Sequence, residues 1–253
     1  MRKTILISGS TAGIGEACAI EFAKKGYQLI LTGRRSERLE KLKEELTDKY
    51  SIHVHTLNFD IRSHQEVVDA VSSIPDEFKN IDVLLNNAGL AAGVNPIDKG
   101  SLEDWEQMID TNVKGLLYLT KEIIPIFKEK NAGHIINIGS IAGKMAYPKG
   151  NVYCATKSAV QTLTEGMRID LLPYGIKVSQ VAPGAVETEF SLVRLKGDSQ
   201  AAKKVYDGYQ PLVAEDIANV VAYIADLPAH MNINDILVMP TAQANAYIYH
   251  KSK

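Results

Sequence analysis

A serine, a tyrosine and a lysine lie within residues 137–157 at a spacing that suits proton transfer. Tyr153 and Lys157 are four residues apart. They share one face if residues 151–172 form a helix, as small and apolar residues at helical intervals indicate. A phenol has a pKa near ~10 and is a weak base at neutral pH, but an adjacent positive charge favours the phenolate. We therefore expect Lys157 to lower the pKa of Tyr153.

Ser140 follows an apolar run, residues 133–138, that is typical of a buried strand. A loop between Ser140 and Tyr153 could place the serine hydroxyl beside the phenol, where it would hold a substrate oxygen. Tyrosine and lysine at this spacing are also common as a surface pair on a helix. The interpretation therefore depends on the rest of the chain.

A glycine-rich turn near the N-terminus supplies this context. Residues 4–8 are predicted to form a buried parallel strand, followed by Gly9, Gly13 and Gly15 and then by a helix that extends to Lys25. Such glycines let backbone N–H groups approach a pyrophosphate at the positive end of a helix. The spacing G-x-x-x-G-x-G differs from the commoner G-x-G-x-x-G, and alone it is equally compatible with a plain strand-to-helix turn.

Two arginines follow the second predicted strand, residues 27–32. NAD-binding proteins carry an acidic residue near this point for the ribose 2′-hydroxyl, whereas arginine accommodates the 2′-phosphate of NADP. Arg34 and Arg35 occupy the position, and no acidic residue comes between the strand and Glu37. A carboxylate would repel the phosphate, so the sequence favours NADP.

Two further polar residues have alternative interpretations. Asp60 follows the predicted strand 52–59, and ligands of open α/β sheets bind at such strand ends, but an aspartate there is equally typical of a helix N-cap. Asn112 lies among apolar residues of a predicted helix. Because a buried amide needs hydrogen-bond partners, Asn112 is either a backbone clamp or a site residue.

The composition excludes several classes of protein. A formal net charge of -2 over 253 residues gives no indication of a nucleic-acid or membrane partner. Cys18 and Cys154 lack disulfide or zinc spacing, which fits a reducing, cytoplasmic location. His53 and His55 have no third ligand nearby, so no metal site is expected. No stretch approaches the length of a membrane span, and the N-terminal apolar run is too short for a signal peptide.

Strands and helices alternate along the chain, which predicts an α/β fold. We expect a single Rossmann-type domain over residues 1–253, with a doubly wound parallel sheet and helices on both faces. Roughly residues 1–140 would bind the cofactor, and roughly residues 141–253 would carry the catalytic and substrate-binding groups. Residues 197–208 are polar and weakly patterned and are expected to belong to a mobile substrate flap.

These features together resemble the short-chain dehydrogenase/reductase family over essentially the whole chain. The glycine turn, Asn86-Asn87-Ala88-Gly89, Asn112, Ser140, Tyr153, Lys157 and Pro183-Gly184 occur in the family's order at familiar spacings. The resemblance implies that Tyr153 is the general acid/base and that Lys157 lowers its pKa and holds the nicotinamide ribose. Ser140 would orient the substrate oxygen, and Asn112 would keep a water in a proton relay.

The resemblance also implies the contacts to NADP. The pyrophosphate would lie on Gly9, Ser10, Thr11, Gly13, Ile14 and Gly15. Arg34 and Arg35 would bind the 2′-phosphate, Asp60 the adenine and Asn87 the adjoining ribose, and the nicotinamide would contact Pro183, Gly184, Val186 and Thr188. Ser8 replaces the threonine that is usual before the first glycine and keeps a hydroxyl.

Longer stretches resemble the NADP-dependent 3-hydroxy acid dehydrogenases, which act on serine, allo-threonine and 3-hydroxypropionate-type substrates. The ending HMNINDILVMPTAQA replaces the V-D-G-G-like ending of many family members. Such substrates carry a carboxylate, and Arg194 is our candidate to bind it because a guanidinium forms two parallel hydrogen bonds to a carboxylate. The alternative is a surface ion pair of Arg194 with Glu187, Glu189 or Asp198. Lys144 and Lys149 are weaker candidates.

Two other functions remain open. A reductase of 3-oxoacyl thioesters or of other ketones would share the same catalytic set. A regulator that senses NADP without turnover would be expected to lose Tyr153 or Lys157, and this chain keeps both. Apolar residues on more than one face of the helices predicted in 101–130 and 151–172 suggest a homo-oligomer, and the resemblance favours a tetramer.

Overall fold

A seven-stranded parallel sheet runs through the centre of the computed structural model, which describes residues 2–252. Its strands are β1 (Thr4–Ser8), β2 (Gln28–Gly33), β3 (Val54–Asn58), β4 (Ile81–Asn86), β5 (Gly133–Ile138), β6 (Ile176–Pro183) and β9 (Asp235–Val238). Their spatial order is β3-β2-β1-β4-β5-β6-β9. The chain therefore winds outward from β1 to one edge, returns to β4 and continues to the other edge. The predicted doubly wound sheet is confirmed.

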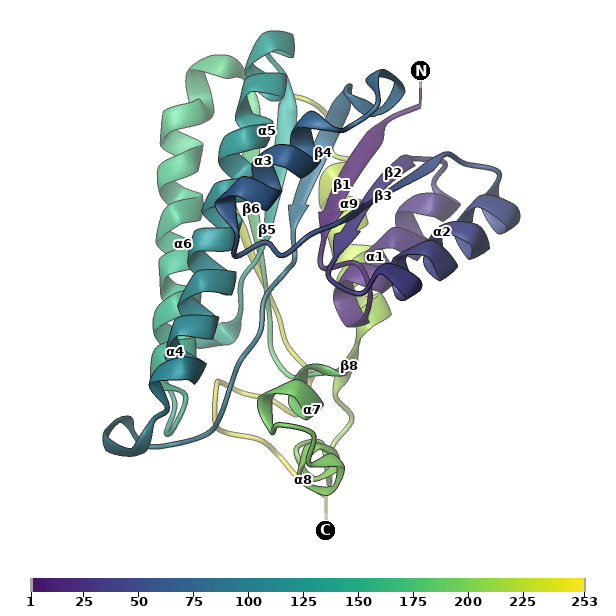
Figure 1. The fold of residues 1–253 in the computed structure, drawn as a ribbon. Coiled ribbons are helices and arrows are strands. Elements are labelled where there is room, and N and C mark those ends of the chain that lie inside the picture. The colour runs from purple at the N-terminus through teal and green to yellow at the C-terminus, as the bar shows by residue number, and fades with distance from the viewer. Residues whose placement is uncertain (1, 253) are drawn as a thin grey trace.

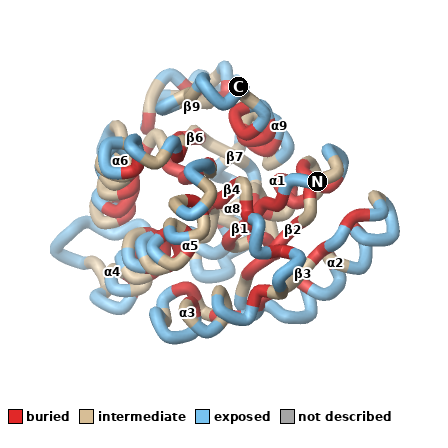
Figure 2. The backbone as a smooth tube through the Cα atoms, turned by 90° about the horizontal axis from the view of Figure 1, so that it is seen from above, coloured by how far each residue is buried: buried red, intermediate tan, exposed pale blue. Residues whose placement is uncertain are grey.

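Helices cover both faces of this sheet (Figure 1). One face is covered by α1 (Gly13–Lys24), α2 (Ser36–Tyr50) and α9 (Ala214–Ala225), and the other by α3 (His64–Ser72), α5 (Leu116–Lys130) and α6 (Asn151–Leu171). The helix α4 (Leu102–Ile109) joins α5 through a π-helical turn, Asp110–Gly115. Figure 2 shows buried residues between the layers and exposed residues on the outer helix surfaces.

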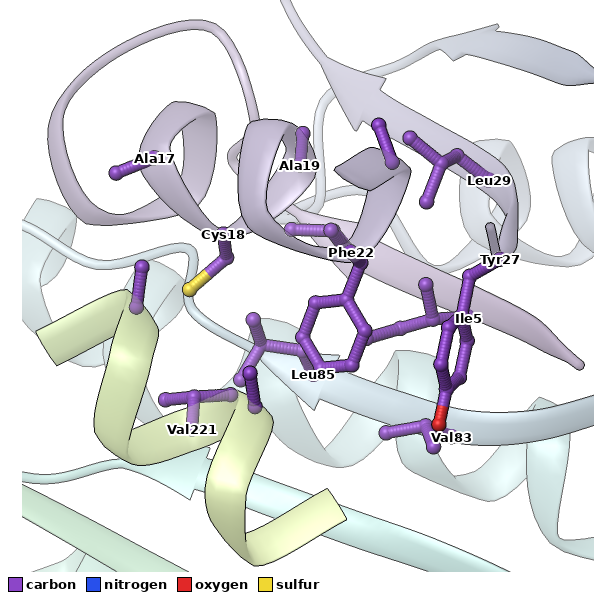
Figure 3. Close-up of a cluster of buried hydrophobic side chains, with 14 of the residues drawn as sticks. Ile5, Ala17, Cys18, Ala19, Phe22, Tyr27, Leu29, Val83, Leu85 and Val221 are labelled. Atoms are coloured by element: carbon purple, nitrogen blue, oxygen red, sulfur yellow. The ribbon is translucent and has the colours of Figure 1, made fainter. Parts of the chain in front are cut away.

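The packing of α1 against the sheet and α9 holds the start of α1 in place (Figure 3). Phe22 is fully buried, and its ring meets Tyr27 edge-on with 4.9 Å between ring centroids. Cys18 lies on α1 and its side chain points toward α9, which carries Val221. Cys18 and Cys154 are both free thiols. Burying a side chain such as Phe22 stabilises a fold by roughly 1.5–3 kcal/mol. The glycine turn that precedes α1 is therefore attached to a tightly packed layer.

Two short helices and a small two-stranded sheet lie beyond the carboxyl ends of the central strands (Figure 1). They are α7 (Phe190–Arg194), α8 (Ser199–Lys204), β7 (Val186–Glu187) and β8 (Leu212–Val213). α8 falls inside the segment 197–208, which is polar and weakly patterned in sequence and whose role as part of a mobile substrate flap remains a prediction. Asp198 caps it by accepting a hydrogen bond from the backbone N–H of Ala201. Within residues 2–252, no helix has the length and apolarity needed to cross a membrane.

Candidate active site

A cavity of about 680 Å³ opens where the central strands end. Pockets for small ligands commonly measure roughly 300–1,000 Å³, and in open α/β sheets they lie outside the carboxyl ends of the strands. Most of the predicted site residues line it: Gly9, Thr11, Gly13, Ile14, Arg34, Arg35, Asp60, Asn87, Ser140, Tyr153, Lys157, Pro183, Gly184, Val186, Thr188 and Arg194. Segments separated by up to 185 residues in the sequence therefore share one cavity.

Three predicted site residues lie behind the cavity wall. Ser10 is fully buried and its hydroxyl donates to the Thr32 carbonyl at 3.2 Å. Gly15 allows close packing, because a Cβ there would lie 2.3 Å from the Gly9 carbonyl oxygen. The third, Asn112, is 2% exposed. In this structure these residues shape the cavity and do not face it.

The glycine turn is held open by its backbone conformation and by β4. Gly9 has φ +67°, and a Cβ there would lie 2.9 Å from the Cα of Ala88. The Ser8 hydroxyl accepts hydrogen bonds from the backbone N–H groups of Asn87 and Ala88, both at 3.0 Å. The Asn87 amide in turn donates to the carbonyls of Ser8 and Gly9. The hydroxyl retained at Ser8 therefore joins β1 to the end of β4 beneath the turn, and the missing side chain at Gly9 lets the turn pack closely against Ala88.

A basic cluster lies beside the turn, at the end of β2. Arg35 directs Nε and Nη2 to the Thr11 hydroxyl at 3.0 and 2.8 Å. Arg38, one helical turn further along α2, donates to the Thr11 carbonyl at 3.4 Å. Both arginines also contact Glu189, and hydrogen bonds from these two arginines hold the pKa of Glu189 below its usual value. Arg38 was not predicted, although its i, i+3 spacing from Arg35 on one helix face was a usable signal.

Asp60 borders the same end of the cavity and is paired with two cations. Its carboxylate accepts from Arg62 Nε at 3.0 Å and lies 3.9 Å from Nη1 of Arg34. The Arg62 hydrogen bond is the main reason why the pKa of Asp60 is lowered. An adenine contact by Asp60 remains a prediction, and its ion pair with Arg34 places both side chains at the same end of the cavity.

Tyr153 and Lys157 lie in the first turns of α6 and are both buried, at 8% and 6% exposure. Burial raises the pKa of Tyr153 and Tyr147 adds to the rise, whereas the neighbouring Ser140 hydroxyl and Arg194 oppose it. The net shift is opposite to the predicted lowering, because desolvation of the phenolate outweighs the nearby positive charge.

The Lys157 ammonium, instead of turning to the phenol, donates to the Ile138 carbonyl at 2.8 Å. Burial lowers the pKa of Lys157 to about 8. The Ser140 side chain has the predicted position beside Tyr153, and its hydroxyl also accepts from the backbone N–H of Ala142 at 3.1 Å.

Asn112 lies in the π-helical turn and acts as a backbone clamp. Its Oδ1 accepts from the Leu90 N–H at 2.8 Å, and its Nδ2 donates to the Leu90 carbonyl at 2.8 Å and to the Thr156 hydroxyl at 3.1 Å. One acceptor and two donors of the amide are thus engaged. Of the two alternatives left open by the sequence, the side-chain contacts support the clamp, which ties the loop after β4 to α6.

Arg194 ends α7 and points toward the rings of Tyr147 and Tyr153. Its guanidinium carbon lies 5.7 Å from the Tyr153 ring centroid, and its Nη1 donates to the Tyr147 hydroxyl at 2.7 Å. The alternative ion pair with Glu189 is replaced by the contacts of Glu189 with Arg35 and Arg38. Lys144, a weaker candidate, pairs with Asp235. Lys149, the other weak candidate, lines the cavity.

Several cavity residues were missed by sequence reasoning. Phe190 packs on Tyr153 with 5.6 Å between ring centroids. Tyr147 holds Arg194, and Gln243 accepts from the Ala185 N–H at 2.8 Å and donates to the Tyr249 hydroxyl at 2.9 Å. Their contacts join distant segments, so only the pocket itself reveals them. Among residues 2–252, no group of three or more His, Cys, Asp or Glu is placed to hold a metal.

Comparison with known proteins places this site in a family. A family model described as short chain dehydrogenase matches residues 3–197. An NADP-dependent 3-hydroxy acid dehydrogenase of Salmonella typhi is 47% identical over 243 residues, with 96% of both chains covered. The sulfoacetaldehyde reductase 2 of Chromohalobacter salexigens is 46% identical over 245 residues, again with 96% of both covered.

A solved structure gives the same answer. The closed form of a serine dehydrogenase complexed with NADP+ superposes with a TM-score of 0.92 at 45% identity, over 99% of this chain and 100% of that one. The agreement in sequence and fold over nearly the whole chain establishes that this chain belongs to the short-chain dehydrogenase family.

Proposed function

We propose that this enzyme is an NADP-dependent dehydrogenase of small 3-hydroxy acids, interconverting substrates of the serine, allo-threonine or 3-hydroxypropionate type with their 3-oxo products. The enzyme class and the use of NADP, both predicted from the sequence, are confirmed by the relatives. The substrate and the role of each residue are our proposal.

The position of Arg194 is the observation that carries the choice of substrate. Its guanidinium faces the rings of Tyr147 and Tyr153, at 5.4 and 5.7 Å from their centroids. Hydrogen bonds to the Tyr147 hydroxyl and, at 3.4 Å, to the Gly93 carbonyl orient it. A guanidinium suits a carboxylate, and here it lies close to the proposed proton donor. A short substrate can therefore place its acid group on Arg194 and its reacting oxygen on Tyr153.

The residues present fit the cofactor. The bare backbone at Gly9 and Gly13 leaves space for a pyrophosphate, and Arg34, Arg35 and Arg38 supply positive charge for a 2′-phosphate. When bound, NADP accepts or supplies the hydride at the substrate carbon. We propose that Pro183, Gly184, Val186 and Thr188, which line the catalytic end of the cavity, contact the nicotinamide.

The chain's own residues handle the proton. In the reductive direction Tyr153 donates its phenolic proton to the substrate oxygen, while the Ser140 hydroxyl holds that oxygen. The raised pKa of Tyr153 keeps the phenol protonated and ready to donate. In the oxidative direction the proton returns to Tyr153, and the Lys157 ammonium, also buried in this end of the cavity, favours the phenolate that must accept it.

The Arg194 guanidinium would also suit a second class of substrate. A sulfonate is also an anion, and one of the relatives is named a sulfoacetaldehyde reductase. Reduction of a 3-oxoacyl thioester would instead leave Arg194 without an anion near Tyr153. These alternatives can be separated by substrate.

The test is a panel of initial rates. NADP+ reduction is measured with L-serine, L-allo-threonine, 3-hydroxypropionate and 3-hydroxybutyrate, and NADPH oxidation with malonic semialdehyde, sulfoacetaldehyde, an acetoacetyl thioester and a neutral ketone. We expect the free acids to be preferred. Arg194→Gln should raise KM for acidic substrates about 10- to 100-fold, since a hydrogen bond to a charged group is worth roughly 1.5–3 kcal/mol, and leave the neutral ketone nearly unchanged.

Tyr153→Phe serves as the catalytic control in the same panel, with an expected loss of about 10²- to 10⁴-fold in turnover and retained NADPH binding. Activity confined to the thioester would overturn the proposed substrate class. Turnover of Tyr153→Phe close to that of the parent enzyme would overturn the assignment of the proton donor.

We also propose that the enzyme is a homo-oligomer, with a tetramer favoured. Exposed apolar side chains occur on the helices where the sequence suggested them. They are Leu102 and Ile109 on α4, Leu117 on α5, and Ile169 and Leu172 at the end of α6, at 37–73% exposure. Closed symmetric assembly is the usual way in which such faces are covered.

A further inference from the structure

Glu189 occupies the basic cluster at the cofactor end of the cavity. Its two carboxylate oxygens bridge two arginines, with Oε2 at 3.0 Å from Nη1 of Arg35 and Oε1 at 2.9 Å from Nη1 of Arg38. Glu189 comes from the segment between β7 and α7, whereas Arg35 lies between β2 and α2 and Arg38 lies in the first turn of α2. The contact therefore joins parts of the chain more than 150 residues apart.

The same N–H groups are the ones that a 2′-phosphate would need. Arg35 also donates to the Thr11 hydroxyl through Nε and Nη2, so Nη1 is the nitrogen that donates to Glu189. The Glu189 carboxylate thus presents two anionic oxygens to these arginines, which is how a phosphate presents its own oxygens. Glu189 and a bound 2′-phosphate cannot both hold the same donors at these distances.

We propose that Glu189 is an internal competitor for the 2′-phosphate of NADP, and that the phosphate displaces it from Arg35 and Arg38 when the cofactor binds. This inference rests on the proposed function, in particular on the arginine cluster as the 2′-phosphate site.

The displacement is feasible because the contact is weak and the phosphate carries more charge. The side chains of Arg35, Arg38 and Glu189 are 44%, 49% and 44% exposed, and half-exposed ion pairs contribute little to stability. A phosphate monoester carries about −1.5 to −2 charges near neutral pH, against −1 for a carboxylate. NAD has no such group and leaves Glu189 in place.

Displacement also acts on the catalytic end of the cavity. The next residue, Phe190, packs on Tyr153 and begins α7, the helix that ends with Arg194. A ligand that moves Glu189 therefore moves the start of the segment that bears on both Tyr153 and the proposed carboxylate site. Glu189 thus connects recognition of the 2′-phosphate to the placement of α7.

Equilibrium binding to the whole protein tests the competition without turnover. Calorimetric titrations compare 2′,5′-ADP, which carries the 2′-phosphate, with 5′-AMP, which lacks it. Glu189→Gln should bind 2′,5′-ADP about three- to tenfold more tightly, the scale expected when weak ion pairs no longer compete, and bind 5′-AMP unchanged. Glu187→Gln is the matched control, because Glu187 lies two residues earlier in β7, and it should change neither affinity.

Hydrogen exchange gives a second readout. 2′,5′-ADP should alter exchange in residues 186–197 of the parent protein, and this alteration should be smaller in Glu189→Gln, where the contact is already weakened. Unchanged or weaker binding of 2′,5′-ADP by Glu189→Gln would overturn the competition. It would mean that Glu189 is inert or holds the arginines ready for the phosphate.

A variant that combines Arg34→Ala, Arg35→Ala and Arg38→Ala separates failure of this inference from failure of the proposed site. If this variant keeps the preference for 2′,5′-ADP over 5′-AMP, the 2′-phosphate is bound elsewhere and the proposed site is wrong. If the preference is lost but Glu189→Gln binds like the parent protein, the site stands and only the role of Glu189 is rejected.

Discussion

Burial governs the pKa values of Tyr153 and Lys157, the two proposed catalytic groups. Removal from water disfavours the charged form of each, so the pKa of Tyr153 rises and that of Lys157 falls to about 8. The phenol is thereby kept protonated, as its proposed role in reduction requires. The ammonium is retained near neutral pH at a cost to stability, since a buried charge with a single carbonyl partner, Ile138, is poorly compensated.

The loss of stability caused by the buried Lys157 ammonium has a predictable pH dependence. Unfolding returns the pKa of Lys157 to its ordinary 10.5, so between about pH 8 and 10.5 the unfolded chain binds more protons at this site than the folded chain. Its destabilising contribution is complete below pH 8 and disappears as the pH rises to 10.5. We expect the stability of Lys157→Met relative to the parent protein to fall by on the order of 3 kcal/mol across this window.

The measurement is urea unfolding of both proteins at several pH values, without added cofactor. The variant also loses the hydrogen bond to the Ile138 carbonyl, but this loss is a constant offset and does not affect the pH dependence. A stability difference that stays flat from pH 8 to 10.5 would show that Lys157 titrates normally in the folded protein.

The secondary-structure elements around the site are joined by a few buried polar side chains. Asn112 links the π-helical turn to the loop after β4 and, through Thr156, to α6. Ser8 and Asn87 link β1 to the end of β4. π-Helical turns inside helices often occur at functional sites, and this one places an amide where three segments meet. A few hydrogen bonds therefore link the segments that lie between the glycine turn and α6.

Asn112→Leu tests how much the hydrogen bonds of Asn112 contribute to stability. Leucine keeps a similar volume but leaves both backbone groups of Leu90 without their present partner. Each unsatisfied buried group costs about 1–3 kcal/mol, so we expect a loss of roughly 2–4 kcal/mol in the free energy of unfolding. Thr156→Ser, which keeps a hydroxyl at the third contact, should cost much less. An Asn112→Leu variant as stable as the parent protein in urea unfolding would show that the clamp is dispensable.

The whole molecule brings the site together by reversing its winding direction between β1 and β4. This reversal opens a crevice at the carboxyl ends of the strands, and the additional layer of α7 and α8 lies over that edge (Figure 1). The outer helices expose apolar side chains, with Ile169 at 72% and Leu172 at 73%. Both faces of the sheet are already covered by helices, so these side chains are free to pack against other copies of the chain.

The proposed assembly makes a direct prediction about these side chains. The parent protein should behave as an oligomer, with a tetramer expected, in light scattering at micromolar concentration. Replacing Ile169 and Leu172 together by lysine should reduce the molecular mass of the assembly measured by light scattering. The free energy of unfolding of the single subunit should change little, because neither side chain is buried within the subunit. A parent protein that is monomeric at these concentrations would contradict the proposal.

The main strands and helices of this protein follow from its amino-acid sequence alone. β1 and β5 begin and end at the predicted residues, and the helix predicted from Asn151 differs from α6 only at its last residue. Apolar periodicity and glycine placement act over short distances, so a single sequence reveals them. The i, i+4 spacing of Tyr153 and Lys157 and the paired arginines after β2 belong to the same local information.

The contacts of the side chains around the cavity depend instead on the tertiary structure. It turned Arg194 toward Tyr147, engaged Asn112 with Leu90, and set Glu189 against Arg35. It also reversed the expected pKa shift of Tyr153 by burying the phenol. These contacts join residues far apart in the chain, and burial depends on everything packed around a group. Neither can be inferred from local spacing, because both exist only after the layers of the fold have come together.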